Sequence, residues 1–238
     1  MLTFGSLFAG IGGFDLGLER AGMACAWQVE REPYAVRVLE KHWPNVRRHD
    51  DVCTFPPAEG NWAVDLICGG FPCQDISVAG KGLGLAGKRS GLWVEMHRII
   101  SELRPRYVIV ENVAALLFRG METILGDLSK IGYDAEWHVV PACAVGAPHR
   151  RERVWVVAYA DRAGFKQQRW PESESTQYAT VERCSWWETE PAVGRVVDGL
   201  PHRVDRLRGL GNAVVPQIVE LIGRAIIESL GGPAGGRE

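Results

Sequence analysis

Residues 2–21 read LTFGSLFAGIGGFDLGLERA and predict a strand, a glycine turn and a helix in succession. Residues 2–8 are apolar enough for a buried strand. Apolar and small residues then recur at helical spacing, at Phe14, Gly17, Leu18 and Ala21. The intervening glycines let a ligand approach the backbone and leave the helix N-terminus facing a polar or anionic group. A tight structural turn uses the same residues, so this stretch alone leaves a binding role and a packing role open.

Strands and helices are expected to alternate along the rest of the chain as well. Further strands are expected at residues 24–29, at 64–68, at 107–110 and, for a short one, within 47–52; helices are expected at 33–42, 92–103, 124–131 and after Pro216. The strands expected at 135–140 and 154–158 have only a polar turn between them, which indicates an antiparallel pair at a sheet edge. We therefore expect an α/β fold with a mostly parallel, doubly wound sheet and an antiparallel edge hairpin.

Acidic residues follow the second and third expected strands. Glu30 comes directly after the second, close to the spacing at which nucleotide-binding α/β folds place an acid on the ribose hydroxyls. In residues 47–52, RRHDDV, Asp51 can accept a hydrogen bond from an adenine amino group. These positions favour a nucleoside-type cofactor, although a solvated polar loop explains the second acid equally well.

A cysteine follows the fourth expected strand. Residues 69–77, GGFPCQDIS, leave the carboxyl end of that strand, where open α/β sheets bind their ligands. Pro72 restricts the backbone just before Cys73, and the glycine-rich run up to Gly91 can bend. A fixed thiol beside such a loop indicates a nucleophile with a lid. On this segment alone, a small buried cysteine in an ordinary turn is the commoner explanation.

A carboxylate follows the fifth expected strand. Glu111 opens the sequence ENV at 111–113, and a charge placed there is costly unless it has a partner or a function. The polar turn between the last two strands reads APHRRER at 147–153 and carries three arginines.

Composition sets broad limits. The 238 residues are 46% hydrophobic, which supports one good core with a small second lobe. The six cysteines show no CxxC spacing, so we expect neither a disulfide framework nor a metal site. No apolar run approaches the roughly 20 residues of a membrane helix, and no targeting segment is evident, so we expect a cytoplasmic protein. The net charge of -2 neither supports nor excludes a nucleic-acid partner.

Residues 161–202 lose periodicity. Tryptophans and arginines that can stack on bases and touch phosphates stand there among acidic residues, so a recognition lobe and a partly disordered insertion are both open.

Taken together, these stretches resemble the DNA cytosine-5 methyltransferases. The matching sequences are FAGIGG (8–13), GGFPCQDIS (69–77), ENV (111–113), RRER (150–153) and GNAVVPQ (211–217). They appear in the family's order, and the resemblance covers residues 3–158 and 203–230. It implies the class I methyltransferase fold, with S-adenosylmethionine as cofactor and S-adenosylhomocysteine as product, and methylation of C5 of cytosine in DNA on a flipped-out base.

The resemblance also assigns residues. It implies that Cys73 attacks C6 of the base, that Glu111 donates to N3, that Arg153 binds O2 and that Arg151 supports the pocket. The implied cofactor pocket comprises Phe8, Gly10, Ile11, Gly12, Glu30, Asp51, Val52, Leu92, Asn212 and Val214. Beyond the resemblance, we expect DNA contacts from Gln74, Ser77, Arg89, Arg169, Trp186, Trp187 and Arg195.

Two departures from the family concern the cofactor pocket and target recognition. Arg31 replaces the aromatic residue common after the ribose acid, and Ser6 stands where an acid is frequent. The recognition region is also far shorter than usual. We expect a catalytic and cofactor domain at 1–160, a short recognition lobe at 161–202, a returning segment at 203–230 and a flexible tail at 231–238.

The expected partners are double-stranded DNA and a cognate restriction endonuclease or specificity partner, with no membrane and a monomeric state, in a bacterial or phage-infected cell. Three alternatives remain: an RNA (tRNA) cytosine-5 methyltransferase, a non-catalytic DNA-binding relative, and an NAD-dependent oxidoreductase based on the glycine turn and Glu30 alone.

Overall fold

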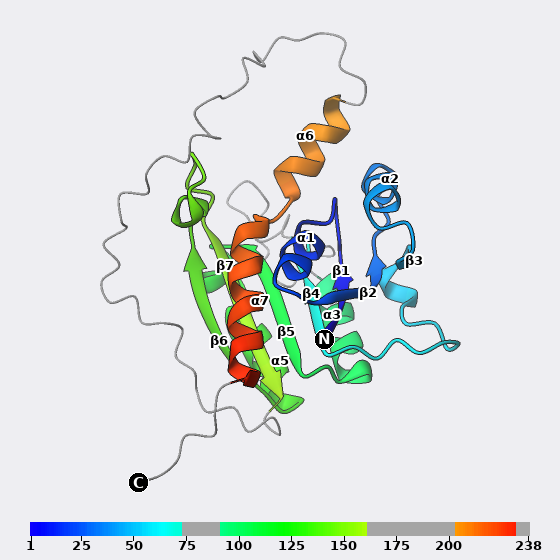
Figure 1. Cartoon of the computed structure of the whole chain (residues 1–238). Coiled ribbons are helices and arrows are strands. Elements are labelled where there is room, and N and C mark those ends of the chain that lie inside the picture. Colours follow the sequence, from blue (N-terminus) through cyan, green and yellow to red (C-terminus); the bar gives the residue numbers. More distant parts are fainter. Residues whose placement is uncertain (73–90, 161–202, 232–238) are drawn as a thin grey trace.

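A seven-stranded sheet forms the centre of the molecule (Figure 1). The computed structural model describes residues 1–72, 91–160 and 203–231. The strands are β1 (Thr3–Leu7), β2 (Ala24–Val29), β3 (Arg47–His49), β4 (Leu66–Gly69), β5 (Tyr107–Val113), β6 (Tyr133–Val140) and β7 (Arg153–Ala160). They lie in the order β3-β2-β1-β4-β5-β7-β6. The first five are mutually parallel, whereas β7 runs antiparallel to both β5 and β6, so the expected edge hairpin is confirmed.

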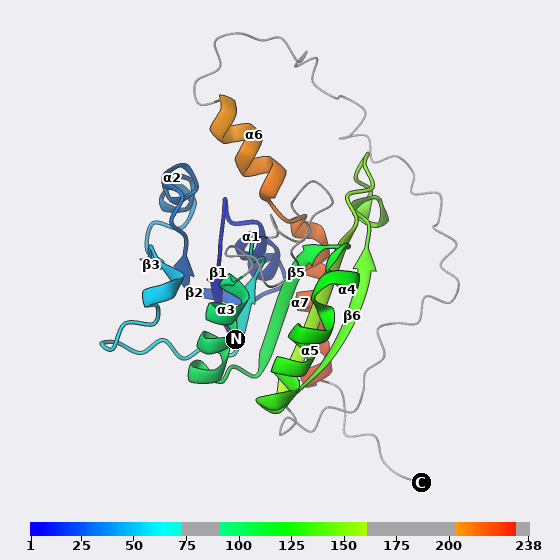
Figure 2. The same cartoon turned by 180° about the vertical axis from the view of Figure 1, so that it is seen from behind.

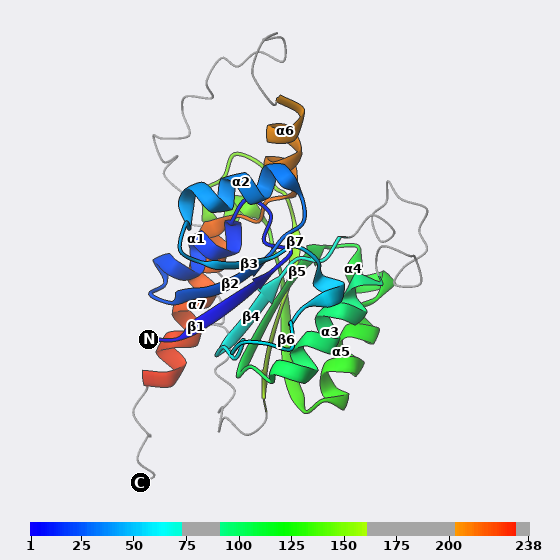
Figure 3. The ribbon, with the colours of Figure 1, turned by 90° about the vertical axis from the view of Figure 1, so that its right-hand side faces the viewer.

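Helices cover both faces of the sheet (Figure 3). One face carries α3 (Leu92–Leu103), α4 (Leu116–Arg119) and α5 (Met121–Lys130), and the other carries α1 (Gly13–Arg20) and α7 (Pro216–Gly231). The remaining helices are α2 (Pro33–His42), α6 (Arg203–Asn212) and the short 3-10 turns η1 (Val52–Thr54) and η3 (Ala142–Val145). Figure 2 shows α3, α4 and α5 in front of the sheet from the opposite side.

The alternation of side chains along each strand explains why helices cover both faces of the sheet. In β5, Val108 and Val110 join the core beneath α3 and α5, while Tyr107 and Ile109 join the core beneath α1 and α7. Successive side chains of a strand point to opposite faces, so a strand that is apolar at every position must be covered on both. The doubly wound α/β fold predicted from the sequence is thereby confirmed.

The first helix, α1, and the last helix, α7, pack against each other. Gly17 of α1 lies so close to α7 that an added Cβ would come within 2.5 Å of the Val219 Cβ and 2.6 Å of the Pro216 carbonyl oxygen. Gly223 of α7 approaches Ala21 in the same way, at 2.8 Å. The C-terminal helix therefore packs directly beside the first helix.

Several local expectations were wrong. Helical spacing predicts His42 on the same face as Ala35 and Leu39, but His42 is exposed, and Trp43 packs against Gly12 in the glycine turn. Spacing also predicts Leu230 on the same face as Val219 and Ile222, but Leu230 is 39% exposed and lies outside the buried stripe of α7. The helix α6 was not anticipated, because its sequence RVDRLRGLGN contains two glycines and many charges.

The segment Gly209–Leu230 is long and apolar enough to cross a membrane by length and composition, contrary to the sequence expectation. It is interrupted between α6 and α7, however, and Ile218, Val219 and Ile222 are buried in the core shared with α1. One side of α7 therefore belongs to the core of the domain, whereas Leu210, Leu221 and Leu230 of the segment are exposed.

Candidate active site

The strand order reverses at β1, because the chain moves outward through β2 and β3 and then returns to β4 on the other side. The carboxyl ends of β1 and β4 therefore form the crevice in which doubly wound folds bind ligands. Residues that follow β1, β2, β3, β4 and β5 all reach this edge, which is where the sequence placed the candidate site residues.

The segment that leads to Cys73 is attached to the end of β5. Asn112 donates from its side-chain Nδ2 to the Phe71 carbonyl oxygen at 3.1 Å, and its side-chain Oδ1 accepts from the Val113 backbone amide at 2.9 Å. Phe71 and Asn112 are both buried. The backbone is thus fixed up to the residue before Pro72. Cys73 itself lies outside the described residues.

Glu111 lies at the same edge and is 8% exposed. Its carboxylate pairs with Arg153, Nε to Oε1, at 3.0 Å. Burial raises the pKa of Glu111 to about 7, and the nearby charges of Arg153 and Arg151 oppose this shift. The group is therefore divided between its protonated and ionised forms near neutral pH, which suits a proton donor.

Gly70 makes room for this carboxyl group. A Cβ at residue 70 would lie 2.8 Å from Oε2 of Glu111. The turn that leads to Pro72 and the end of β5 can approach this closely because residue 70 has no side chain. Nothing in the local sequence indicates that Gly70 lies against Glu111.

Arg151 lies in the turn before β7, and Arg153 is the first residue of β7. Arg151 donates from Nη2 to the Ala213 carbonyl oxygen at 2.8 Å, which ties this turn to the junction between α6 and α7. Its φ of 31° lies in the left-handed region, which non-glycine residues rarely adopt. Residues distant in sequence thus meet beside Glu111.

The glycine turn and Glu30 form a second part of the site. The Glu30 carboxylate accepts from the Gly10 amide at 2.7 Å and from the Glu32 amide at 2.7 Å, one through each oxygen. Gly10 and Gly12 have φ values of 57° and 87°. Phe8, with φ of 53°, and Ile11 are partly exposed in the same turn. These two backbone amides therefore fix the direction of the Glu30 carboxylate.

The remaining residues predicted for the cofactor lie around this turn. Asp51 caps η1, and the Cys53 amide that donates to it lowers its pKa. Val52 is buried, and Leu92 is packed against the same core. Val214 contacts Gly13, where an added Cβ would lie 2.8 Å from its Cγ2. Asn212 is exposed at the end of α6.

The sequence matches the family model for C-5 cytosine-specific DNA methylases over residues 2–196. The chain belongs to this family. Among curated members, it is 33% identical over 179 residues to Type II methyltransferase M.HgiCII of Herpetosiphon aurantiacus, covering 73% of this chain and 41% of that protein. It is 30% identical over 178 residues to Type II methyltransferase M.HhaI of Haemophilus parahaemolyticus, covering 71% and 53%. The chain thus spans about half or less of the length of these relatives.

Solved structures agree with the fold. A protein described as a DNA modification methyltransferase encoded within an Escherichia coli prophage matches with a TM-score of 0.58 and 26% identity, covering 68% of this chain and 47% of that chain. A DNMT2 mutant of Spodoptera frugiperda matches with a TM-score of 0.60 and 21% identity, covering 72% and 54%. At that identity the second likeness concerns the fold alone.

All seven residues predicted to touch DNA lie outside the residues that the structure describes: Gln74, Ser77, Arg89, Arg169, Trp186, Trp187 and Arg195. Within the ranges that the structure describes, no group of three or more His, Cys, Asp or Glu side chains could hold a metal ion.

A buried polar cluster beneath the glycine turn was missed from the sequence. Asp15 of α1 is fully buried and accepts from the Gln28 amide at 2.8 Å, the Ser6 hydroxyl at 3.2 Å and the Cys25 thiol at 3.4 Å. Burial raises the pKa of Asp15, and these donors oppose that shift. An acid on the helix thus lies beside Ser6, the strand position where the resemblance led us to expect one. Its helical spacing gave no signal that the side chain points inward.

Proposed function

We propose that this chain transfers a methyl group from S-adenosylmethionine to C5 of cytosine in DNA. Membership of the C-5 cytosine-specific methylase family supports the reaction class. The observation that carries the proposal is the buried Glu111 carboxyl group, with a pKa of about 7 and Arg153 at 3.0 Å, beside the end of the strand that leads to Cys73.

The glycine turn fits an adenosine cofactor. Glu30 presents a carboxylate whose direction is fixed by two backbone amides, as ribose hydroxyls require. Asp51, Val52 and Leu92 would hold the adenine, and Phe8, Gly10, Ile11, Gly12, Asn212 and Val214 would line the rest of the pocket. S-adenosylmethionine supplies an electrophilic methyl group there.

Cys73 would activate the base. Its thiolate forms a bond to C6, and the electrons of the C5–C6 double bond move into the ring. Glu111 donates its proton to N3, where negative charge would otherwise accumulate. Arg153 hydrogen-bonds O2 and Arg151 supports the pocket, so both stabilise the developing charge. C5 would then take the methyl group as the bond between that methyl carbon and the sulfonium sulfur breaks, and N3 would return its proton to Glu111. Loss of the C5 proton to a base would re-form the C5–C6 double bond and release Cys73 as the thiolate.

The target cytosine must leave the duplex, because neither C5 nor C6 is accessible inside it, and unstacking costs a few kcal/mol. We assign the loop from Gln74 to Gly91 as the lid over the flipped base, with Gln74, Ser77 and Arg89 facing DNA. We assign residues 161–202, with Arg169, Trp186, Trp187 and Arg195, as a minimal recognition lobe between the catalytic part, 1–160, and the returning segment, 203–230. A cognate endonuclease or specificity partner and a cytoplasmic location complete this proposal.

The function is tested by offering the purified chain methyl-labelled S-adenosylmethionine with duplex DNA or with tRNA, then digesting the product to nucleosides. We expect labelled 5-methyl-deoxycytidine from DNA. Label found only in 5-methylcytidine from tRNA would show that the substrate is RNA and not DNA. Absence of label from both, with binding of NAD in place of S-adenosylmethionine, would overturn the proposal.

A further inference from the structure

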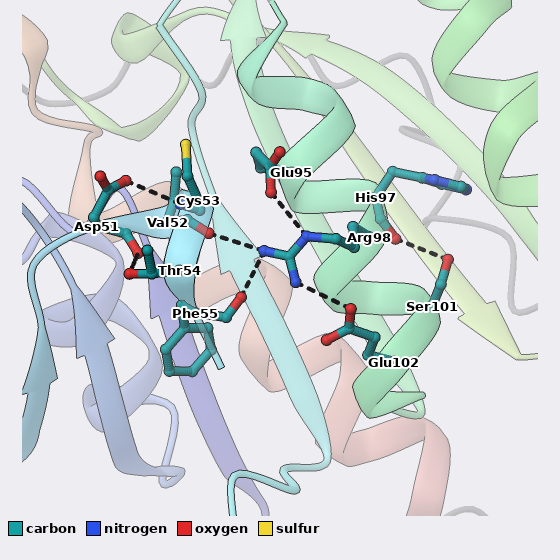
Figure 4. Close-up of polar contacts among 10 residues, drawn as sticks. All are labelled: Asp51, Val52, Cys53, Thr54, Phe55, Glu95, His97, Arg98, Ser101 and Glu102. Atoms are coloured by element: carbon teal, nitrogen blue, oxygen red, sulfur yellow. Dashed lines mark hydrogen bonds and ion pairs between the residues drawn. The ribbon is translucent and has the colours of Figure 1, made fainter. Parts of the chain in front are cut away.

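Arg98 of α3 is bound to the backbone of the η1 turn (Figure 4). Its Nη2 donates to the Val52 carbonyl oxygen at 3.1 Å and to the Phe55 carbonyl oxygen at 2.6 Å. These two carbonyls bracket the turn that follows Asp51. A single planar guanidinium can bind both because its donors form a fixed fork.

Two carboxylates of the same helix hold the guanidinium in place. Glu95 accepts from Nε at 2.8 Å and Glu102 accepts from Nη1 at 3.0 Å. The Arg98 side chain is 34% exposed, so these pairs count for their geometry more than for their energy. They leave Nη2 directed at the turn, as Figure 4 shows.

Hydrogen bonds within the η1 turn also fix the position of Asp51. The Asp51 carboxylate accepts from the Cys53 amide at 2.9 Å, and the Asp51 carbonyl oxygen accepts from the Thr54 hydroxyl at 3.1 Å. Phe55, at the end of the turn, is fully buried. A shift of either carbonyl held by Arg98 would therefore change where the Asp51 carboxylate points.

We propose that Arg98 is a positioning residue that gives the cofactor pocket its selectivity for adenine by holding the η1 turn and, through it, Asp51. This inference rests on the proposed function, in which Asp51 accepts from the adenine amino group. Arg98 itself touches no part of the cofactor. It acts from the second half of α3, whose first residue is Leu92, so the helix supplies both a pocket residue and the support of the opposite wall.

The test compares binding of S-adenosylhomocysteine and S-inosylhomocysteine by calorimetry. The inosine compound carries an oxygen in place of the amino group and cannot donate to Asp51. We expect the wild-type chain to prefer the adenosine compound by about tenfold, the value of one hydrogen bond. In Arg98→Met this ratio should fall toward about one, and in Arg98→Lys it should be intermediate, because an ammonium lacks the planar fork.

Arg224→Met is the matched control, since Arg224 also pairs with a glutamate of its own helix, Glu220, at 2.7 Å, but lies on α7. Its ratio should equal that of the wild type. Circular dichroism checks folding, and Arg98→Lys serves if the methionine variant does not fold. An Arg98 variant that binds both ligands more weakly at an unchanged ratio would overturn the inference and leave the function intact. Wild-type protein that binds neither ligand would overturn both.

Discussion

At the scale of single residues, burial and charge compete at Glu111. Arg153 at 3.0 Å favours the carboxylate, and burial favours the neutral acid; the net result is a pKa of about 7 in place of 4.5. Between these values the folded protein binds a proton that the unfolded chain does not. Folding is therefore progressively disfavoured as the pH rises from about 4.5 to 7.

The variant Glu111→Gln removes this titration. Its stability relative to the wild type should rise with pH, by up to about 3 kcal/mol between pH 4.5 and 7, and level off above. Urea unfolding of both proteins across this pH range measures the difference. A difference that stays constant with pH would show that the carboxyl group is not held in its neutral form. The same variant should lose methyl transfer.

Gly70 offers a test of how closely this carboxyl group is confined. An alanine there would place Cβ 2.8 Å from Oε2, so Gly70→Ala should displace Glu111 from Arg153. We expect about a hundredfold loss of methyl transfer, with a cost in stability of about 1–3 kcal/mol. Activity assays and urea unfolding check the two effects.

Gly126→Ala in α5 is the control for that substitution, because an added Cβ there meets nothing within 4 Å. It should leave activity unchanged and stabilise the helix by roughly 0.5–1 kcal/mol. Equal activity in both alanine variants would contradict the role given to Gly70.

At the scale of secondary structure elements, close packing of α1 on α7 joins the two ends of the described chain. Gly17→Ala would bring Cβ within 2.5 Å of the Val219 Cβ and 2.6 Å of the Pro216 carbonyl oxygen, neither of which can move without shifting α7. We expect a loss of about 1–3 kcal/mol from overpacking. Thermal unfolding should show it, and a melting temperature equal to that of the wild type would contradict this packing.

The alternation of strands and helices was predictable because their periodicities differ. The central strands β4, β5 and β7 are also rich in apolar residues, since both faces of the sheet are covered there. Contacts between segments that are distant in sequence were not predictable. Nothing in local sequence indicates that Arg151 would reach Ala213, that Asp15 would be buried with Ser6 and Gln28, or that Arg98 would bind the η1 turn. Such contacts depend on how the elements pack.

At the scale of the whole molecule, the chain spans only 41% to 53% of the two curated relatives described above. The recognition lobe that we propose for residues 161–202 would have only about forty residues with which to read bases. We predict a short or degenerate target site. Bisulfite sequencing of plasmid DNA treated with the protein should reveal methylation at many related sites, and a long, fully specified site would contradict the prediction.

The central claim, a covalent attack by Cys73 on cytosine, is tested most directly with duplex DNA in which target cytosines are replaced by 5-fluorocytosine. Fluorine at C5 cannot leave as a proton does, so the elimination step is blocked and the bond between sulfur and C6 persists. In the presence of S-adenosylmethionine the account predicts a protein–DNA adduct that survives denaturing electrophoresis, and none with Cys73→Ser. An adduct of undiminished yield with Cys73→Ser, or no adduct with a wild-type chain that methylates ordinary DNA, would contradict it.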